Sequence, residues 1–237
     1  MAVRLPAAAA TLAGMDPLVL THWESGRLDA RPVVLLHGLT STGETWDEVA
    51  AGLSDRAQVV VVDQRGHGAS PWPGEYGFAL MRDDLLRTLA TLDLLDRRPV
   101  LVGHSMGGVV AYLAAQARPD AFAALVLEDP VPPVPLPRDP GERPDGPLPY
   151  DWDVVPAIFD DIMAPDPRWL ADLGTVPCPV LVVGGDHSHI PQRLLVAMAE
   201  RFPRGRYLAL DTDHSVHANR PGEFVAAVRA VLDEHDL

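Results

Sequence analysis

The chain has 237 residues, a length that suits one open-sheet α/β domain better than two independent domains. Hydrophobic residues make up 47% and charged residues 22% of the sequence, which excludes a disordered or fibrous chain. The 33 acidic residues outnumber the 19 basic ones, so the field of the protein repels phosphates, and we expect neither a nucleic-acid partner nor an anionic membrane.

The basic residues are all arginine, which excludes a Schiff-base lysine and the phosphate-binding lysine of a P-loop. The single cysteine, Cys178, forbids an internal disulfide and a multi-cysteine metal site. No uninterrupted run of about 18 apolar residues is present, so we expect no membrane insertion. The alanine-rich residues 1–14 resemble a signal peptide only weakly, because Pro6 interrupts them. A cytoplasmic location is therefore expected.

Short runs rich in Val, Ile and Leu alternate with amphipathic stretches, a pattern typical of a mostly parallel sheet covered by helices. The first strand is expected at Pro17–Trp23, followed by a turn around Gly26. Further strands are expected at Pro32–Leu36, Gln58–Val62, Pro99–Val102, Ala124–Leu127, Pro179–Val183 and Arg206–Leu210. Helices are expected at Thr42–Leu53, Leu80–Leu95, Met106–Arg118, Pro191–Phe202 and Pro221–Glu234.

A proline-rich segment interrupts this alternation. Nine of the residues from Pro130 to Pro149 are proline, which neither a helix interior nor a central strand accommodates. Two short helices are expected after it, at Asp151–Ala164 and Asp166–Leu173. The pattern predicts a small lid, residues 131–176, inserted into a core made of residues 1–130 and 177–237.

Three aromatic residues of the expected lid, Trp152, Phe159 and Trp169, have two possible roles. They could pack the lid onto the core, or they could line a pocket for an acyl or aryl group. We carry them as candidate substrate-binding residues.

The main chemical motif is Gly103-His104-Ser105-Met106-Gly107, a G-x-S-x-G sequence between an expected strand and an expected helix. A serine on such a sharp turn adopts strained backbone geometry, and small neighbours two residues away on each side leave room for the turn. The helix that follows directs its N-terminal N–H groups at any developing oxyanion. Ser105 is therefore the candidate nucleophile.

Two further motifs follow neighbouring strands: His37-Gly38-Leu39-Thr40, and the segment from Asp63 to Ser70, which reads DQRGHGAS. With the serine motif, they make the sequence resemble the α/β-hydrolase superfamily over nearly the whole chain. The resemblance implies an α/β-hydrolase fold and an oxyanion hole made by the backbone N–H groups of Leu39 and Met106. It also implies that His37 and His67 shape turns rather than take part in catalysis.

A serine hydroxyl is a weak nucleophile until a base takes its proton, so a histidine is required. The family order is serine, acid, histidine, and the resemblance places the base at His214, after the last strand and before the last helix. Asp211 and Asp213 stand where the family has glycines around this turn. His217 is the alternative base.

Three carboxylates compete to orient this histidine. Asp186 follows the strand at Pro179–Val183, the usual place in the family, although it lies one residue early in the loop. Glu128 and the adjacent Asp129 stand at the end of the preceding strand, which a minority of the superfamily uses. Strand order favours Asp186, and an apolar strand end that carries Glu128 requires a partner for that carboxylate.

The residue types of Asp186, His187 and His189 also suit a metal, but neighbouring loop positions need not converge, and we expect no metal there. The resemblance implies a cofactor-free serine hydrolase of small-molecule carboxylic esters, lactones or thioesters, with an acyl-enzyme on Ser105. The serine argues against the dehalogenase and epoxide-hydrolase branches, whose nucleophile is aspartate. Two alternatives stay open: a carbon–carbon bond hydrolase of diketones, and a weakly active or inactive ligand receptor.

Overall fold

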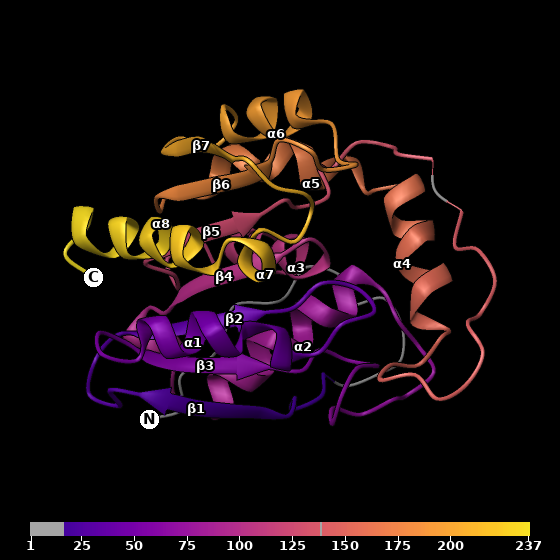
Figure 1. Ribbon diagram of the computed structural model, residues 1–237, viewed down its shortest axis with the longest axis horizontal. Coiled ribbons are helices and arrows are strands. Elements are labelled where there is room, and N and C mark those ends of the chain that lie inside the picture. The colour runs from indigo at the N-terminus through magenta and orange to yellow at the C-terminus, as the bar shows by residue number, and fades with distance from the viewer. Residues whose placement is uncertain (1–16, 138) are drawn as a thin grey trace, which may run out of the picture.

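The computed structural model describes residues 17–137 and 139–237, so the weak signal-peptide pattern of residues 1–14 lies outside the described residues. The described chain forms one seven-stranded sheet with helices on both faces (Figure 1). The strand order is β1-β3-β2-β4-β5-β6-β7; β1 pairs antiparallel with β3, and the other pairs are parallel. The strands are β1 His22–Gly26, β2 Pro32–Leu36, β3 Gln58–Val62, β4 Val100–His104, β5 Ala124–Glu128, β6 Val180–Gly185 and β7 Gly205–Leu210.

The central strands β2 to β6 are buried along their whole length. Their runs of Val and Leu are covered from both faces, as parallel sheets require. This confirms the predicted α/β-hydrolase architecture and the parallel order of the core.

Helices divide between the two faces. α1 and α8 cover one face and meet each other across it, whereas α2, α3 and α6 pack on the other (Figure 1). The helices are α1 Asp47–Leu53, α2 Phe78–Thr91, α3 Met106–Ala117, α4 Val154–Met163, α5 Pro167–Ala171, α6 Gln192–Ala199, α7 Val216–Asn219 and α8 Pro221–Glu234, with 3-10 turns at Gly43–Trp46, Leu95–Arg97 and Asp172–Thr175. Within the described range, no helix has the length and apolarity needed to cross a membrane.

The first strand begins later than the sequence predicted, at His22 rather than Pro17. The residues before it are hydrogen-bonded to α2 instead of the sheet: Leu18 N donates to Asp84 Oδ1 at 2.7 Å, and Leu20 N donates to Thr88 Oγ1 at 2.9 Å. Side chains of α2 therefore take the backbone N–H groups that the predicted strand would have used in the sheet.

The segment of residues 131–176, which we call the cap, connects β5 to β6 and carries α4 and α5. Figure 1 shows α4 standing beyond the ends of the central strands. The cap is joined to the core by backbone hydrogen bonds from Gly68 N to Pro149 O and from Asp151 N to Gly66 O, both 2.8 Å long. The cap therefore covers the edge of the sheet at which the parallel strands end.

Candidate active site

Ser105 lies on the turn between β4 and α3, with φ 49° and ψ −110°. This is a strained conformation for a residue with a side chain, of a kind found at functional sites. The turn is held by hydrogen bonds from Ser105 N to Glu128 O at 2.8 Å and from Gly108 N to Ser105 O at 3.1 Å. The elbow that the sequence predicted is therefore present, with its serine at the N-terminus of α3.

The glycines of the motif lie where any side chain would collide with neighbouring backbone atoms. A Cβ at Gly103 would lie 2.4 Å from the carbonyl oxygen of Gly107, and one at Gly107 would lie 2.3 Å from that of Leu36. Both distances are far below van der Waals contact, so α3 approaches β2 and β4 this closely only because these residues are glycine.

His214 follows β7 and contacts a buried carboxylate. Its Nδ1 donates to Asp129 Oδ2 at 2.5 Å, and the Asp129 side chain is fully buried. Asp129 Oδ2 also accepts from the Ser188 hydroxyl, and Oδ1 accepts from Gln192 Nε2 at 3.1 Å. Asp129 has a φ of 41°, so its backbone turns directly after β5. The donors to this carboxylate thus come from the loop after β6, the start of α6 and the loop after β7.

Neither of the two carboxylates that the sequence favoured contacts His214. Asp186 is exposed to solvent, and its backbone N–H is bonded to Leu210 O at 2.9 Å. Glu128 is fully buried but binds His217, three residues beyond His214. The structure therefore brings Asp129, the third candidate, to His214, because the backbone turns at Asp129 directly after β5.

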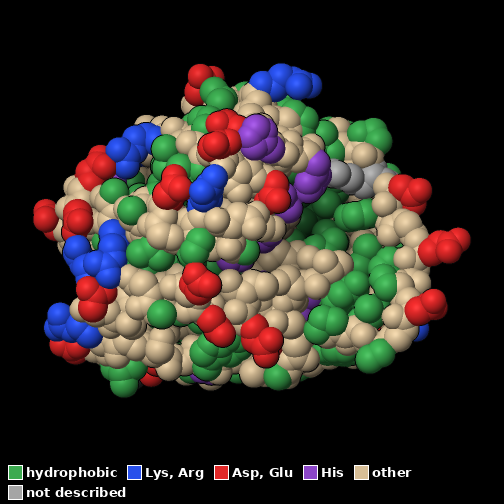
Figure 2. Space-filling view, viewed as in Figure 1, with side chains coloured by type: hydrophobic (Ala, Val, Ile, Leu, Met, Phe, Trp, Pro, Cys, Tyr) green, Lys and Arg blue, Asp and Glu red, His purple; other side chains and the backbone are tan. Residues whose placement is uncertain are grey.

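A cavity of about 360 Å³ opens beside Ser105 and His214. Leu39 and Met106, the expected oxyanion-hole residues, line it next to the serine. Its remaining walls are mostly apolar and come from the cap and the loop after β6, and Figure 2 shows the molecule hollowed on this side with hydrophobic side chains around the hollow. The further lining residues are Thr40, Val131, Pro140, Glu142, Pro144, Trp152, Val155, Ile158, Phe159, Ile162, His189 and Ile190.

Two of the three cap aromatics, Trp152 and Phe159, line this cavity, and Trp169 does not. Trp169 instead packs edge-on against Phe78 of α2, with ring centroids 5.7 Å apart, and its carbonyl accepts from Gln116 Nε2 at 2.8 Å. Trp169 thus lies outside the cavity beside Ser105, because α5 packs against α2 and α3.

The sequence model of a protein family, the alpha/beta hydrolase family, matches residues 33–228 of this chain. The chain belongs to the alpha/beta hydrolase family. It is 28% identical to lipase LipV of Mycobacterium tuberculosis, over 84% of this chain and 92% of that protein. It also resembles the solved structure of a thermophilic esterase from Thermogutta terrifontis, with a TM-score of 0.76, 25% identity, and 91% of this chain and 94% of that chain covered. An enol-lactonase from Burkholderia xenovorans shares the fold, with a TM-score of 0.78, 21% identity, and 90% of this chain and 96% of that chain covered.

In this hydrolase, His37 and His67 are buried and bonded to backbone groups. His37 Nε2 accepts from Gln64 N at 3.0 Å, which ties the turn after β2 to the end of β3, and His67 Nδ1 lies 2.9 Å from Arg65 O. Burial lowers the pKa of His37 to about 4 and that of His67 to about 3, so both rings are neutral at physiological pH. These contacts agree with the turn-shaping role that the resemblance implied.

His189 is a site residue whose place the sequence did not reveal. Its ring lies 4.4 Å from that of His214, and its side chain lines the cavity. The sequence offered it only as a metal ligand with Asp186 and His187, but His187 Nε2 instead meets the exposed Asp211 carboxylate at 2.8 Å. The loop after β6 could be predicted, but the direction of each of its side chains could not.

Proposed function

We propose that this hydrolase cleaves carboxylic ester, lactone or thioester bonds through an acyl-enzyme on Ser105. One observation carries the proposal: Ser105 and His214 line the same cavity, and the Nδ1 of that histidine is held by the buried carboxylate of Asp129. A nucleophile, a base and a group that orients the base are the parts that acyl transfer requires.

The reaction then follows from the roles of these groups. Ser105 Oγ bonds to the substrate carbonyl carbon while its proton passes to His214 Nε2, and the N–H groups of Leu39 and Met106 stabilise the oxyanion. His214 returns the proton to the leaving alcohol or thiol as the acyl-enzyme forms. Water, deprotonated by the same histidine, then attacks the carbonyl carbon of the acyl-enzyme. The bond to Ser105 Oγ breaks, His214 returns the proton to that oxygen, and the acid is released. Throughout, Asp129 holds the Nδ1 proton and stabilises the imidazolium.

The cavity supports a substrate with a neutral acyl or aryl group of modest size. Its volume of about 360 Å³ is near the lower end of the range of about 300–1,000 Å³ for small-molecule sites, and aliphatic and aromatic side chains make most of its wall. Such walls bind apolar groups, while the polar groups beside Ser105 orient the reacting carbonyl.

The test is Ser105→Ala, assayed with p-nitrophenyl butyrate and with a fluorophosphonate probe followed by mass spectrometry. Turnover should fall by more than about 10³-fold, since the remaining groups cannot form the acyl-enzyme, and the probe should label Ser105 in the wild type alone. If the variant keeps more than about a tenth of wild-type turnover, chemistry at Ser105 is excluded. Faster turnover of a vinylogous diketone than of the ester would favour a carbon–carbon bond hydrolase, and an unlabelled wild type would favour a ligand receptor.

A further inference from the structure

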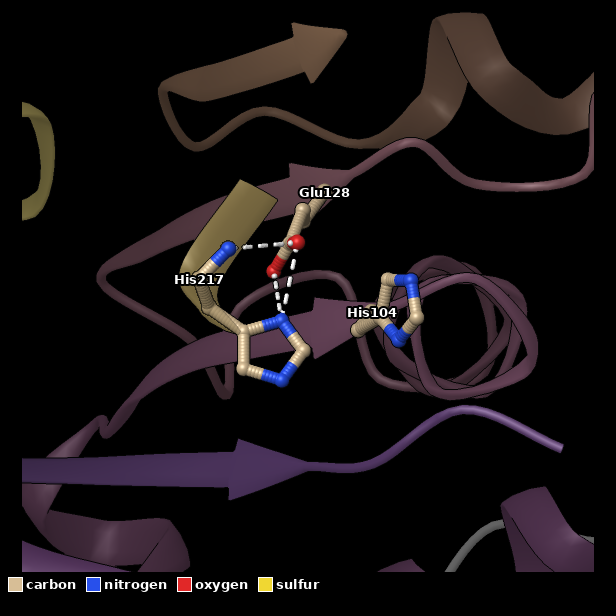
Figure 3. A group of neighbouring side chains, drawn as sticks. All are labelled: His104, Glu128 and His217. Carbon is tan, nitrogen blue, oxygen red and sulfur yellow. Dashed lines mark hydrogen bonds and ion pairs between the residues drawn. The ribbon is translucent and has the colours of Figure 1, made fainter. Parts of the chain in front are cut away.

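Three buried side chains, His104, Glu128 and His217, lie together next to the proposed catalytic residues (Figure 3). They come from the end of β4, the end of β5 and the helix α7. We call these three residues the support cluster. None of them lines the cavity, so they do not meet a substrate there.

Glu128 binds the chain just beyond His214. Its Oε1 accepts the backbone N–H of His217 at 2.9 Å and the Nδ1–H of the same residue at 2.8 Å, and Oε2 lies 2.9 Å from that Nδ1. Burial by itself raises the pKa of Glu128, but the nearby His217 imidazole and the side-chain and backbone hydrogen bonds from His217 lower it overall. Glu128 is therefore an ionised, fully buried carboxylate whose hydrogen-bond donors come from the segment that follows the catalytic base.

His104 binds the backbone of the base itself. Its Nε2 donates to the carbonyl oxygen of His214 at 3.0 Å, and the two rings lie 4.7 Å apart. Burial lowers the pKa of His104 to about 3, so the ring is neutral and carries the donor proton on Nε2. Two contacts thus hold this part of the backbone. His104 binds the carbonyl group of His214, and Glu128 binds the N–H group of His217.

The pairing of the strands connects the support cluster to all three catalytic residues. His104 precedes Ser105, Glu128 precedes Asp129, and β4 and β5 pair in the register that sets His104 opposite Glu128. The indole of Trp46 stacks on the His217 ring, with centroids 4.1 Å apart and an angle of 28°.

From this arrangement we infer that Glu128 and His217 are positioning residues, which hold the backbone of residues 214–217 so that the His214 imidazole meets both Ser105 and Asp129. The inference rests on the proposed serine-hydrolase function. It explains why a carboxylate stands at an otherwise apolar strand end, beside the one that orients the base.

The same three residues could hold a metal by their types, but the distances favour hydrogen bonds. The two side chains of the Glu128–His217 pair meet at 2.8 and 2.9 Å, which are hydrogen-bond distances, and the ligand atoms of the three residues lie within 4.8 Å of one another. Ligand atoms around a tetrahedral zinc lie about 3.4 Å apart, since zinc–nitrogen bonds measure about 2.0–2.1 Å. A metal would have to break the hydrogen bonds that hold α7.

Paired variants separate positioning from simple stabilisation. Glu128→Leu removes the acceptors, whereas Glu128→Gln keeps one acceptor oxygen for the two N–H groups of His217 and replaces the other oxygen and the charge by a neutral NH2 group. His217→Leu removes the donor, whereas His217→Asn keeps an N–H close to the place of Nδ1. Leu89→Ala, in the core on the other face of the sheet, controls for lower stability without a change near the site. For each variant, we would measure kcat and KM on p-nitrophenyl butyrate, count active sites by fluorophosphonate labelling, and record the low-field proton resonance of the His214–Asp129 hydrogen bond.

We expect both Leu variants to lower kcat per labelled site about 10- to 100-fold, with KM within about twofold, because small displacements of a catalytic base are costly. Glu128→Gln and His217→Asn should recover most of this loss, and the low-field resonance should move in the Leu variants only. The inference is overturned if the Leu variants behave like Leu89→Ala, with a lower Tm but wild-type kcat per labelled site and an unchanged resonance. Loss of activity on adding a chelator to the wild type would also overturn it, in favour of a metal.

Two variants keep the outcomes apart. If Ser105→Ala retains turnover, the proposed function fails. If Ser105→Ala abolishes turnover while Glu128→Leu leaves kcat per site unchanged, only the positioning role fails.

Discussion

At the scale of single residues, two adjacent strand ends carry unusual backbone. Ser105 after β4 has a φ of 49° and Asp129 after β5 has a φ of 41°. Both are left-handed conformations, which cost residues with side chains about 1–3 kcal/mol and persist where their surroundings hold them. These two residues directly follow neighbouring parallel strands, where Ser105 lines the cavity and Asp129 binds His214.

Asp129→Asn tests which carboxylate orients the base. The amide cannot stabilise the imidazolium and favours the wrong tautomer of His214, so turnover should fall by about 10⁴-fold with little change in Tm. Asp186→Asn is the matched control, since that side chain is exposed, and it should stay within about twofold of wild type. Ester turnover and thermal melting of both variants decide the matter; collapse of Asp186→Asn beside an active Asp129→Asn would assign the role to Asp186.

At the scale of elements, the cap supplies much of the wall of the cavity beside Ser105. Trp152 and Phe159 line the cavity, while Trp169, also in the cap, packs against Phe78 of α2. Trp152→Ala should therefore change the preference among ester chain lengths, raising kcat/KM for longer acyl groups relative to acetate by about 10-fold, because it enlarges an apolar wall. Trp169→Ala is the control and should lower Tm without changing that ratio. Equal losses on every ester length after Trp152→Ala would assign Trp152 to packing alone.

α4 also contacts the start of α2, which gives the cap a pH-dependent attachment. Asp161 Oδ2 accepts Phe78 N–H at 2.8 Å, and burial raises the pKa of Asp161, opposed by that hydrogen bond and reinforced by Asp160. A carboxyl whose pKa is raised on folding binds its proton more tightly in the folded state, so stability falls as the pH rises from 3.8 through the folded pKa.

Asp161→Asn should consequently raise Tm at pH 7, because the amide oxygen can still accept from Phe78 N–H and no buried charge remains. Below pH 3.8, where the wild-type carboxyl is protonated, the two proteins should melt together. Thermal melts across this pH range measure the difference. A lower Tm for the variant at pH 7 would mean that the charge is favourable at the N-terminus of α2.

At the scale of the whole molecule, one buried ion pair joins three parts of the chain. Arg65, in the loop after β3, binds Asp84 of α2 through two hydrogen bonds of 2.6 and 2.8 Å, and both side chains are fully buried. Asp84 also accepts the backbone N–H of Leu18, in the segment before β1. The pair therefore fixes two segments against α2: the loop after β3, which contacts the cap, and the segment that leads into β1.

Asp84→Leu should destabilise the protein by about 3–5 kcal/mol, because it leaves the Arg65 charge buried without a partner. For a chain of this size, that corresponds to a fall in Tm of about 6–20 °C. Arg65→Met combined with Asp84→Leu should regain most of this loss, since an apolar pair needs no solvation. Calorimetry and urea unfolding measure both; a double variant no more stable than the single one would contradict the account.

Much of the fold could be predicted because its signals are local. β2, β3 and α8 begin and end at the predicted residues, since each is bounded by turn residues and has an apolar pattern of one period. The helix α7 was not predicted, because its four residues have too little sequence to show a period, and packing of Val216 and His217 forms it. The start of β1 shifted because Asp84 and Thr88 of α2 capture the backbone before it.

The sequence by itself determined the serine elbow, because the spacing of Gly103, Ser105 and Gly107 permits few other turns. It also determined which strands the proposed nucleophile and the proposed base follow. Only the tertiary structure decided which carboxylate serves His214. Glu128 and Asp129 are neighbours in sequence, but the turn at the end of β5 directs them to two different histidines. Their partners lie 85 and 89 residues away, and no local pattern specifies which of two adjacent side chains such a distant loop will meet.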